Sequence, residues 1–198
     1  MELTSSEEEI ENEFWDTALS AGRYSHGILN DDMHYPDRSE KIAIRCSFIC
    51  TPDAGYESVK RALLEGCFYS MVVPDYGEGD WCEKYARNKE LPEVCDIGIE
   101  DSTIHIELSA PADSIKFVGH NHRVLHRAYS ATTAEYTMLP TDPYARIMAY
   151  YADGVVIYSN VFARYDSARE ETPYRGDVHS VNIPLTILFN LAVALCLI

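Results

Sequence analysis

Apolar positions recur with helical spacing at the start of the chain and with alternating spacing further on. An acidic first turn near Ser5 and Ser6 precedes a segment that ends at Gly22. Serine followed by glutamate is typical of a capping box, and glycine is the residue that most readily ends a helix in a left-handed conformation. The apolar residues on one face of this predicted helix are Ile10, Phe14, Trp15, Ala18 and Leu19.

Three further elements are predicted before residue 74. The run "IAIRCSFIC" alternates and is rich in β-branched residues, which predicts a strand over residues 42–51. The stretch "TPDAGYESVKRALLEG" predicts a helix that Thr51 or Asp53 caps and Gly66 ends. "CFYSMVV" predicts another strand. Residues 1–73 are therefore expected to form part of an α/β domain.

Short alternating runs then follow a polar, turn-rich stretch at residues 74–96, which is expected to be a linker. Residues 97–166 carry several of these runs at close spacing, and the pair Asp153–Gly154 indicates a hairpin. We expect a small antiparallel, immunoglobulin-like β-sandwich there. The predicted fold class is α+β. Residues 167–198 are expected to be a linker and an apolar tail.

The last part of the tail, "IPLTILFNLAVALCLI", is almost entirely apolar over residues 183–198. It falls short of the ~20 residues that a membrane span needs. We expect a strand or helix that packs on the domain; the alternative is a shortened membrane span.

Composition limits the classes of partner. The net charge of −16 repels phosphate backbones, so we expect no nucleic-acid partner and no binding to an anionic membrane surface. The six cysteines contain no CxxC pair, and the acidic start of the chain is unlike a signal peptide. These features favour unpaired thiols and a cytoplasmic location.

The stretch "LNDDMHYPDRS" holds the strongest candidate chemistry. Asp32 and His34 are two positions apart, so at the end of a strand both side chains would project to one face. A carboxylate and an imidazole are ligands that zinc, manganese or iron accepts, and Asp31 could support them by hydrogen bonding from the second coordination shell. The alternative is a solvated turn in which Asp37 and Arg38 form surface ion pairs.

Other histidines offer weaker patterns. His120 and His122 form an HxH pattern with His126 nearby, but we expect them at an exposed hairpin tip. His26 is expected to be a partly buried strand residue. Asp177 and His179 lie in the predicted linker. No serine or cysteine stands in a glycine elbow that would indicate a nucleophile.

The order of these elements resembles the C-terminal part of the PHP (polymerase and histidinol phosphatase) metal-dependent phosphoesterases. A "W-D-x-x-L-x-x-G" helix, a "D-D-x-H" strand end, an "A-L-x-x-G-x-F-Y" segment and a "Y-S-N" strand follow one another within residues 10–166. The matching residues are Trp15, Asp16, Leu19, Gly22, Asp32, His34, Ala62, Leu63, Gly66, Phe68, Tyr69, Tyr158, Ser159 and Asn160. Val161 stands where the family usually has proline.

The resemblance implies a partial (β/α) barrel followed by the immunoglobulin-like module. It also implies that Asp32 and His34 are two ligands of a divalent-metal cluster that activates water against a phosphoester substrate. The family's earlier HxH, Glu and His ligands have no counterpart before residue 32. We therefore expect an incomplete metal site that is inactive alone, with self-association through uncovered barrel elements. The alternative is a non-catalytic β-sandwich interaction module.

Overall fold

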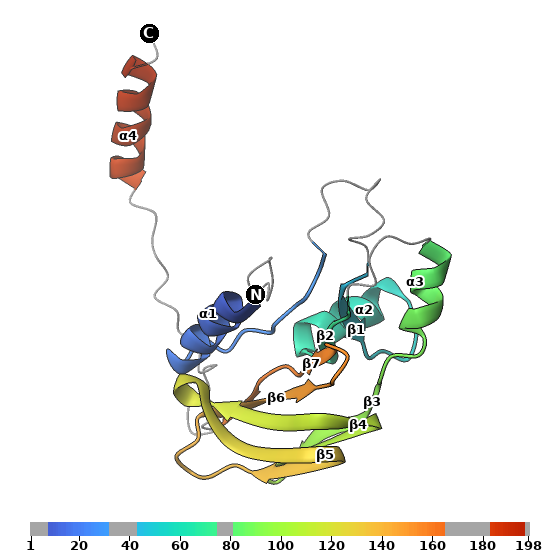
Figure 1. Ribbon diagram of the computed structural model, residues 1–198. Coiled ribbons are helices and arrows are strands. Elements are labelled where there is room, and N and C mark those ends of the chain that lie inside the picture. Colours follow the sequence, from blue (N-terminus) through green and yellow to red (C-terminus); the bar gives the residue numbers. More distant parts are fainter. Residues whose placement is uncertain (1–7, 32–42, 75–80, 165–182, 197–198) are drawn as a thin grey trace.

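The computed structural model describes residues 8–31, 43–74, 81–164 and 183–196 (Figure 1). The helices within these ranges are α1 (Glu8–Ser20), α2 (Tyr56–Glu65), α3 (Trp81–Asn88) and α4 (Ile183–Cys196), with a short 3-10 turn, η2 (His120–His122). The strands are β1 (Arg45–Ile49), β2 (Phe68–Val72), β3 (Val94–Glu100), β4 (Thr103–Gly119), β5 (Arg123–Thr137), β6 (Tyr144–Tyr150), β7 (Val156–Tyr158) and β8 (Phe162–Ala163).

All of these strands belong to one open sheet with the order β1-β2-β7-β6-β4-β3, in which β5 also pairs with β4 and β8 with β6. Every pairing is antiparallel. The α+β class is confirmed, whereas a two-sheet sandwich and a barrel remnant are not, because β2 pairs directly with β7. Strands from residues 1–73 and from residues 97–166 therefore share one sheet.

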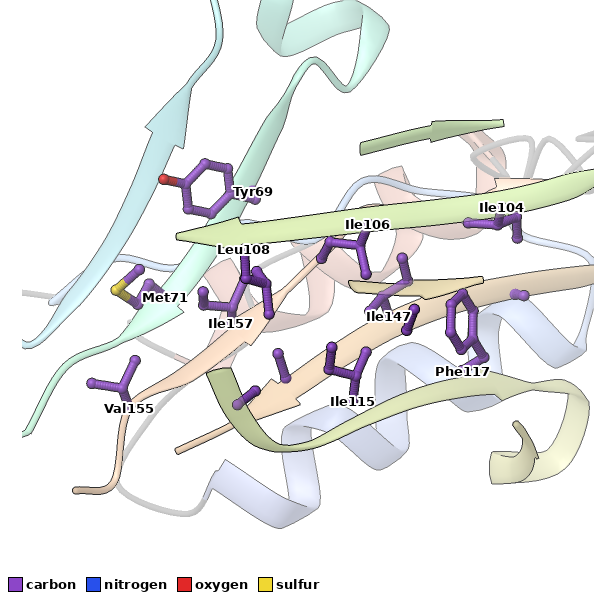
Figure 2. Close-up of a cluster of buried hydrophobic side chains, with 14 of the residues drawn as sticks. Tyr69, Met71, Ile104, Ile106, Leu108, Ile115, Phe117, Ile147, Val155 and Ile157 are labelled. Atoms are coloured by element: carbon purple, nitrogen blue, oxygen red, sulfur yellow. The ribbon is translucent and has the colours of Figure 1, made fainter. Parts of the chain in front are cut away.

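The hairpin of β4 and β5 gives the sheet its main bend. Its register shifts between Glu107 and Ala112, around Pro111. The buried side chains of β4 change phase just after this point, from Ile104, Ile106, Leu108 and Ala112 to Ile115 and Phe117. A bulge bends a strand in this way. As a result, the two halves of β4 face each other across the main hydrophobic core (Figure 2).

Strand β6 is buried on both faces because a different cluster of apolar side chains packs against each face. Ala145, Ile147 and Ala149 point into the main core. Tyr144 and Met148 point the other way, where they pack against Trp15 and Leu19 of α1. The predicted apolar stripe of α1 is thus confirmed at Trp15 and Leu19, although Phe14 is 61% exposed.

Several sequence predictions are confirmed, with shifted boundaries. Gly66 ends α2 with φ +75°, and Gly22 follows α1 with φ +78°. The Asp153–Gly154 turn joins β6 to β7, with Gly154 at φ +93°. The stretch predicted as a linker at residues 74–96 contains α3 and the start of β3. The polar composition of this stretch was read as a linker, so the short amphipathic helix α3 was not predicted.

Helix α4 was predicted to pack on the domain, but it does not. Its described apolar side chains are exposed, from Ile183 at 64% to Leu195 at 74%. Figure 1 shows the helix standing apart from the sheet. The described helices include none that is both long and apolar enough to cross a bilayer.

Candidate functional site

Asp32 and His34, the predicted metal ligands, lie outside the described residues, but both flanks of their segment are described. The carboxylate of Asp31 accepts hydrogen bonds from the backbone N–H groups of Ala43 (2.6 Å), Ile44 (3.0 Å) and Arg45 (2.8 Å). Asp31 and Ala43, which flank the segment that carries Asp32 and His34, are therefore within hydrogen-bonding distance of each other. Asp31, predicted as a second-shell residue, closes this segment in the structure.

Near Asp31, the hydroxyl groups of Ser47 and Ser70 and the backbone of Leu29 form a hydrogen-bonded group that we call the polar frame. Ser47 of β1 donates its hydroxyl hydrogen to the carbonyl of Leu29 (2.9 Å), and its oxygen accepts the Leu29 N–H (3.0 Å). The Ser47 and Ser70 hydroxyls are 3.2 Å apart. Burial, followed by the negative charge of Asp31, raises the pKa of the Cys46 thiol to about 11. The thiol is therefore kept protonated beside the carboxylate.

Asn160 connects this frame to the end of α2 and to β2. Its amide nitrogen donates to the carbonyls of Gly66 (2.9 Å) and Phe68 (2.9 Å), and its amide oxygen accepts the N–H of Gly27 (3.0 Å). The neighbouring Ser159 hydroxyl accepts the N–H of Ile147 (2.8 Å). The Asn160 side chain thus joins the "Y-S-N" stretch to the "A-L-x-x-G-x-F-Y" stretch and to Gly27, which precedes Asp31.

His26 lies under the turn that ends α2; it is partly buried, as predicted, but it is not part of a strand. Its Nε2 is 3.2 Å from the carbonyl oxygen of Leu64, and its ring meets Phe68 edge-on at 6.1 Å between centroids. The space above its ring is closed by Gly66, where an added Cβ would lie 2.6 Å from Nδ1. These contacts give His26 a packing role at this turn.

A buried ion pair joins α1 to β6. Asp16 accepts hydrogen bonds from Nε (2.7 Å) and Nη2 (2.6 Å) of Arg146, and both residues are 1% exposed. The guanidinium carbon lies 4.9 Å from the ring centre of Trp15. His122 Nδ1 is 3.1 Å from the Asp16 carboxylate. Sequence reasoning missed this cluster, although an arginine within the apolar run "ARIMAYYA" is the sign of a buried partner.

The other predicted histidines do not converge on a metal site. His120 and His122 lie at the tip of the β4–β5 hairpin, as predicted, but only His122 contacts Asp16. His126 lies beside Phe117 and Tyr136, with ring centroids 5.9 and 6.4 Å away. Asp177 and His179 lie outside the described residues.

The described residues contain no complete metal site. In the part of the chain that the structure describes, no three His, Cys, Asp or Glu side chains are grouped closely enough to hold a metal ion. Asp31 is engaged by three backbone donors. Zinc sites normally take three or four protein ligands, so Asp32 and His34 supply too few by themselves. The described residues therefore do not form a catalytic metal cluster by themselves, and the ligand roles of Asp32 and His34 stay predictions.

Comparison with known proteins gives no further assignment. No family model, no curated protein and no solved structure matches this chain.

Proposed function

We propose that this chain is the C-terminal portion of a PHP-type metal-dependent phosphoesterase, with Asp32 and His34 as an incomplete ligand pair. In this proposal, α1, β1, α2 and β2 are the last elements of a (β/α) barrel, and residues 97–166 are its immunoglobulin-like appendage. A divalent metal (zinc, manganese or iron) and a phosphoester substrate would be bound only when other residues complete the site.

The observation that carries the proposal is the hydrogen bonding of Asp31. Three backbone N–H groups converge on its carboxylate from residues 43–45. A carboxylate that accepts several N–H bonds fixes the backbone around it. It therefore fixes both flanks of the segment that carries Asp32 and His34, which is what a ligand-bearing loop requires.

The contacts of Asn160 and Asp16 support the same proposal. The "Y-S-N" stretch reaches back to Gly27 through Asn160, and the "W-D" stretch reaches β6 through Asp16 and Arg146. Motif residues that are far apart in the sequence thus hold the region before Asp31 in one arrangement. Such long-range agreement is expected if the motifs belong to one inherited framework.

Ligand counting predicts that the chain alone does not hydrolyse phosphoesters. We expect weak binding of Mn²⁺ or Zn²⁺ by calorimetry, lost in both Asp32→Ala and His34→Ala. Asp113→Ala and His120→Ala, which change exposed residues of β4 and η2, are the matched controls and should leave metal binding unchanged. Loss of binding in the controls, or no binding at all by the native chain, would contradict the ligand assignment.

Activity provides the second part of the test. The metal-loaded chain is assayed with a generic phosphomonoester, and no turnover above that of the metal alone is expected. Robust turnover that Asp32→Ala abolishes would show that the site is complete and that the ligand count is wrong.

The second candidate function is a non-catalytic interaction module. It is favoured by β5, which is 15 residues long and, among the described strands, pairs with β4 alone. An edge strand of this length offers backbone groups for a strand of a partner protein. This function predicts no dependence of any activity on Asp32 or His34.

A further inference from the structure

Hydrogen-bond donors gather where β4, β5 and β6 run side by side. Lys116 of β4 is the register partner of Arg127 on β5 and of Met148 on β6. One step along the same face, Ser114 is opposite both Tyr129 and Tyr150. We call these residues the donor patch: Ser114, Lys116, Arg127, Tyr129 and Tyr150.

The patch lies on the sheet face that α1 partly covers. Met148, beside Lys116, belongs to the cluster of buried side chains around Trp15. Val118, two positions after Lys116, belongs to the same cluster. The patch is thus anchored at one end by a packed core and is open at the other, where Tyr129 is 66% exposed.

Two cations stand directly opposite each other in this patch. Lys116 Nζ lies 4.0 Å from the ring centre of Tyr150, and Arg127 Nη1 donates to the Tyr129 hydroxyl at 3.0 Å. The tyrosine rings therefore hold both side chains over the sheet. Like charges directly opposite each other on neighbouring strands are destabilising. This arrangement is unfavourable unless an anion is bound.

No carboxylate compensates the two cations within the described part of the chain, where neither Lys116 nor Arg127 has an ion-pair partner. Burial, followed by the charge of Arg127, lowers the pKa of Lys116. This positively charged pair contrasts with the chain as a whole, which carries a net charge of −16. Acidic groups are abundant in the sequence, but none of the described ones forms an ion pair with Lys116 or Arg127.

We propose that the donor patch binds a phosphate monoester group. A dianionic phosphate matches the two positive charges, with the planar guanidinium binding two of its oxygens and the ammonium acting as a point charge. The hydroxyls of Ser114 and Tyr129 are further donors beside the pair. The site is independent of the proposed metal ligands, since none of its residues belongs to the segment around Asp31.

Calorimetric titration at low ionic strength tests the proposal with two sources of the same chemistry. The probes are glycerol phosphate in solution and phosphatidylcholine vesicles that contain phosphatidic acid; sodium acetate at equal ionic strength is the monoanion control. We expect saturable binding of at least one phosphate probe, weakened by salt. Binding to glycerol phosphate assigns a soluble source, and binding only to the vesicles assigns a lipid headgroup.

Variants identify the patch as the site. Lys116→Gln and Arg127→Gln should each weaken binding roughly tenfold or more, because each removes a charge-assisted contact. Lys116→Arg should retain it. Lys89→Gln is the matched control, since Lys89 Nζ also lies over a tyrosine ring, 4.6 Å from the centre of Tyr85, and Lys89 does not belong to the donor patch.

Three results would overturn the proposal. They are the absence of saturable binding to both phosphate probes, equal binding of acetate, and an equal loss of affinity in Lys89→Gln. Folding of each variant is checked by circular dichroism. Relief of the charge repulsion should leave Lys116→Gln and Arg127→Gln at least as stable as the native chain, so loss of binding can be separated from loss of fold.

Discussion

Asp16 and Arg146 form a two-point ion pair although they are 130 positions apart in the chain. The pair fixes α1 on the face of the sheet that Tyr144 and Met148 also present to the helix. The Nη1 of Arg146 is buried without a hydrogen-bond partner in the described part of the chain. The contact therefore depends strongly on the one carboxylate.

Replacing Asp16 alone should destabilise the protein severely. Asp16→Ala leaves a buried guanidinium without its counter-charge, which costs about 3–5 kcal/mol. The double variant Asp16→Leu/Arg146→Met should lose far less, because no charge remains buried. Urea unfolding measures both free energies of unfolding. Asp113→Ala, at an exposed position of β4, should stay within about 0.5 kcal/mol of the native chain. An equal loss in the double variant would contradict the role of the unpaired charge.

The ion pair also shows what the sequence could and could not predict. Helical spacing correctly placed Trp15 and Leu19 on the buried face of α1. The same spacing carries no information about a partner on a distant strand, so Arg146 was missed. Similarly, alternation predicted strands in β4 and β6, but it could not show that β2 pairs with β7. Local patterns determine elements, whereas sheet order depends on long-range packing.

Gly66 and Gly22 provide a matched pair for backbone and packing effects. Both have positive φ, +75° and +78°, but an added Cβ at Gly66 meets the ring of His26, whereas nothing lies within 4 Å at Gly22. Gly22→Ala should cost about 1–2 kcal/mol for the left-handed conformation alone. Gly66→Ala should cost about 1–3 kcal/mol more. Thermal unfolding measures the difference.

The His26 ring is the reason why Gly66→Ala should cost more stability than Gly22→Ala, so removing the ring should abolish the extra cost. In Gly66→Ala/His26→Ala the penalty of Gly66→Ala, relative to His26→Ala alone, should fall to that of Gly22→Ala. A penalty that stays unchanged would mean that the His26 ring does not limit the space at Gly66.

Tyr136 should make the stability sensitive to alkaline pH. Burial, followed by the hydrogen bond to Asp142 (2.6 Å), raises the pKa of Tyr136 from 10.0 to about 12. Because the folded-state pKa is the higher one, this stabilisation is complete below about pH 10 and is lost as the pH rises towards about 12. Tyr136→Phe should therefore flatten the decline of the unfolding free energy over this interval.

The measurement for Tyr136 is urea unfolding repeated across this pH interval. Part of the decline should remain in Tyr136→Phe, because burial also raises the pKa of Tyr151 to about 12. At neutral pH the variant should be about 1.5–3 kcal/mol less stable, since a hydrogen bond to a charged group is lost. An unchanged alkaline slope would show that Tyr136 does not titrate as described.

Exposure of α4 predicts that this helix contributes to association rather than to folding. Removing residues 183–198 should leave the melting temperature of the domain unchanged, because the described apolar side chains from Ile183 to Leu195 are exposed. Large exposed apolar surfaces promote association. The shortened chain should therefore be less self-associated in sedimentation velocity. A lower melting temperature would show that α4 does stabilise the sheet.

The candidate metal site shows the same limit of sequence reasoning as the ion pair. The DxH spacing predicted that Asp32 and His34 are metal ligands and that Asp31 supports them, and these roles stay predictions. What the spacing did not indicate is that the Asp31 carboxylate accepts hydrogen bonds from three backbone N–H groups of residues 43–45. Residue spacing predicts the face of a strand to which a side chain points. It does not predict which backbone groups, later in the chain, donate hydrogen bonds to that side chain.

Cys46 offers a chemical measurement of the environment around Asp31. Its thiol has a pKa of about 11, raised by burial and by the Asp31 carboxylate. Because the thiolate is the nucleophile, Cys46 should react with iodoacetamide roughly 100-fold more slowly near neutral pH than a free cysteine peptide. Mass spectrometry of individual peptides should also find it slower than exposed Cys95. Asp31→Asn, which removes the charge, should raise the Cys46 rate and leave the Cys95 rate unchanged. Equal rates of Cys46 and Cys95 in the native chain would contradict the raised pKa of Cys46, and an unchanged Cys46 rate in Asp31→Asn would show that the Asp31 charge does not act on this thiol.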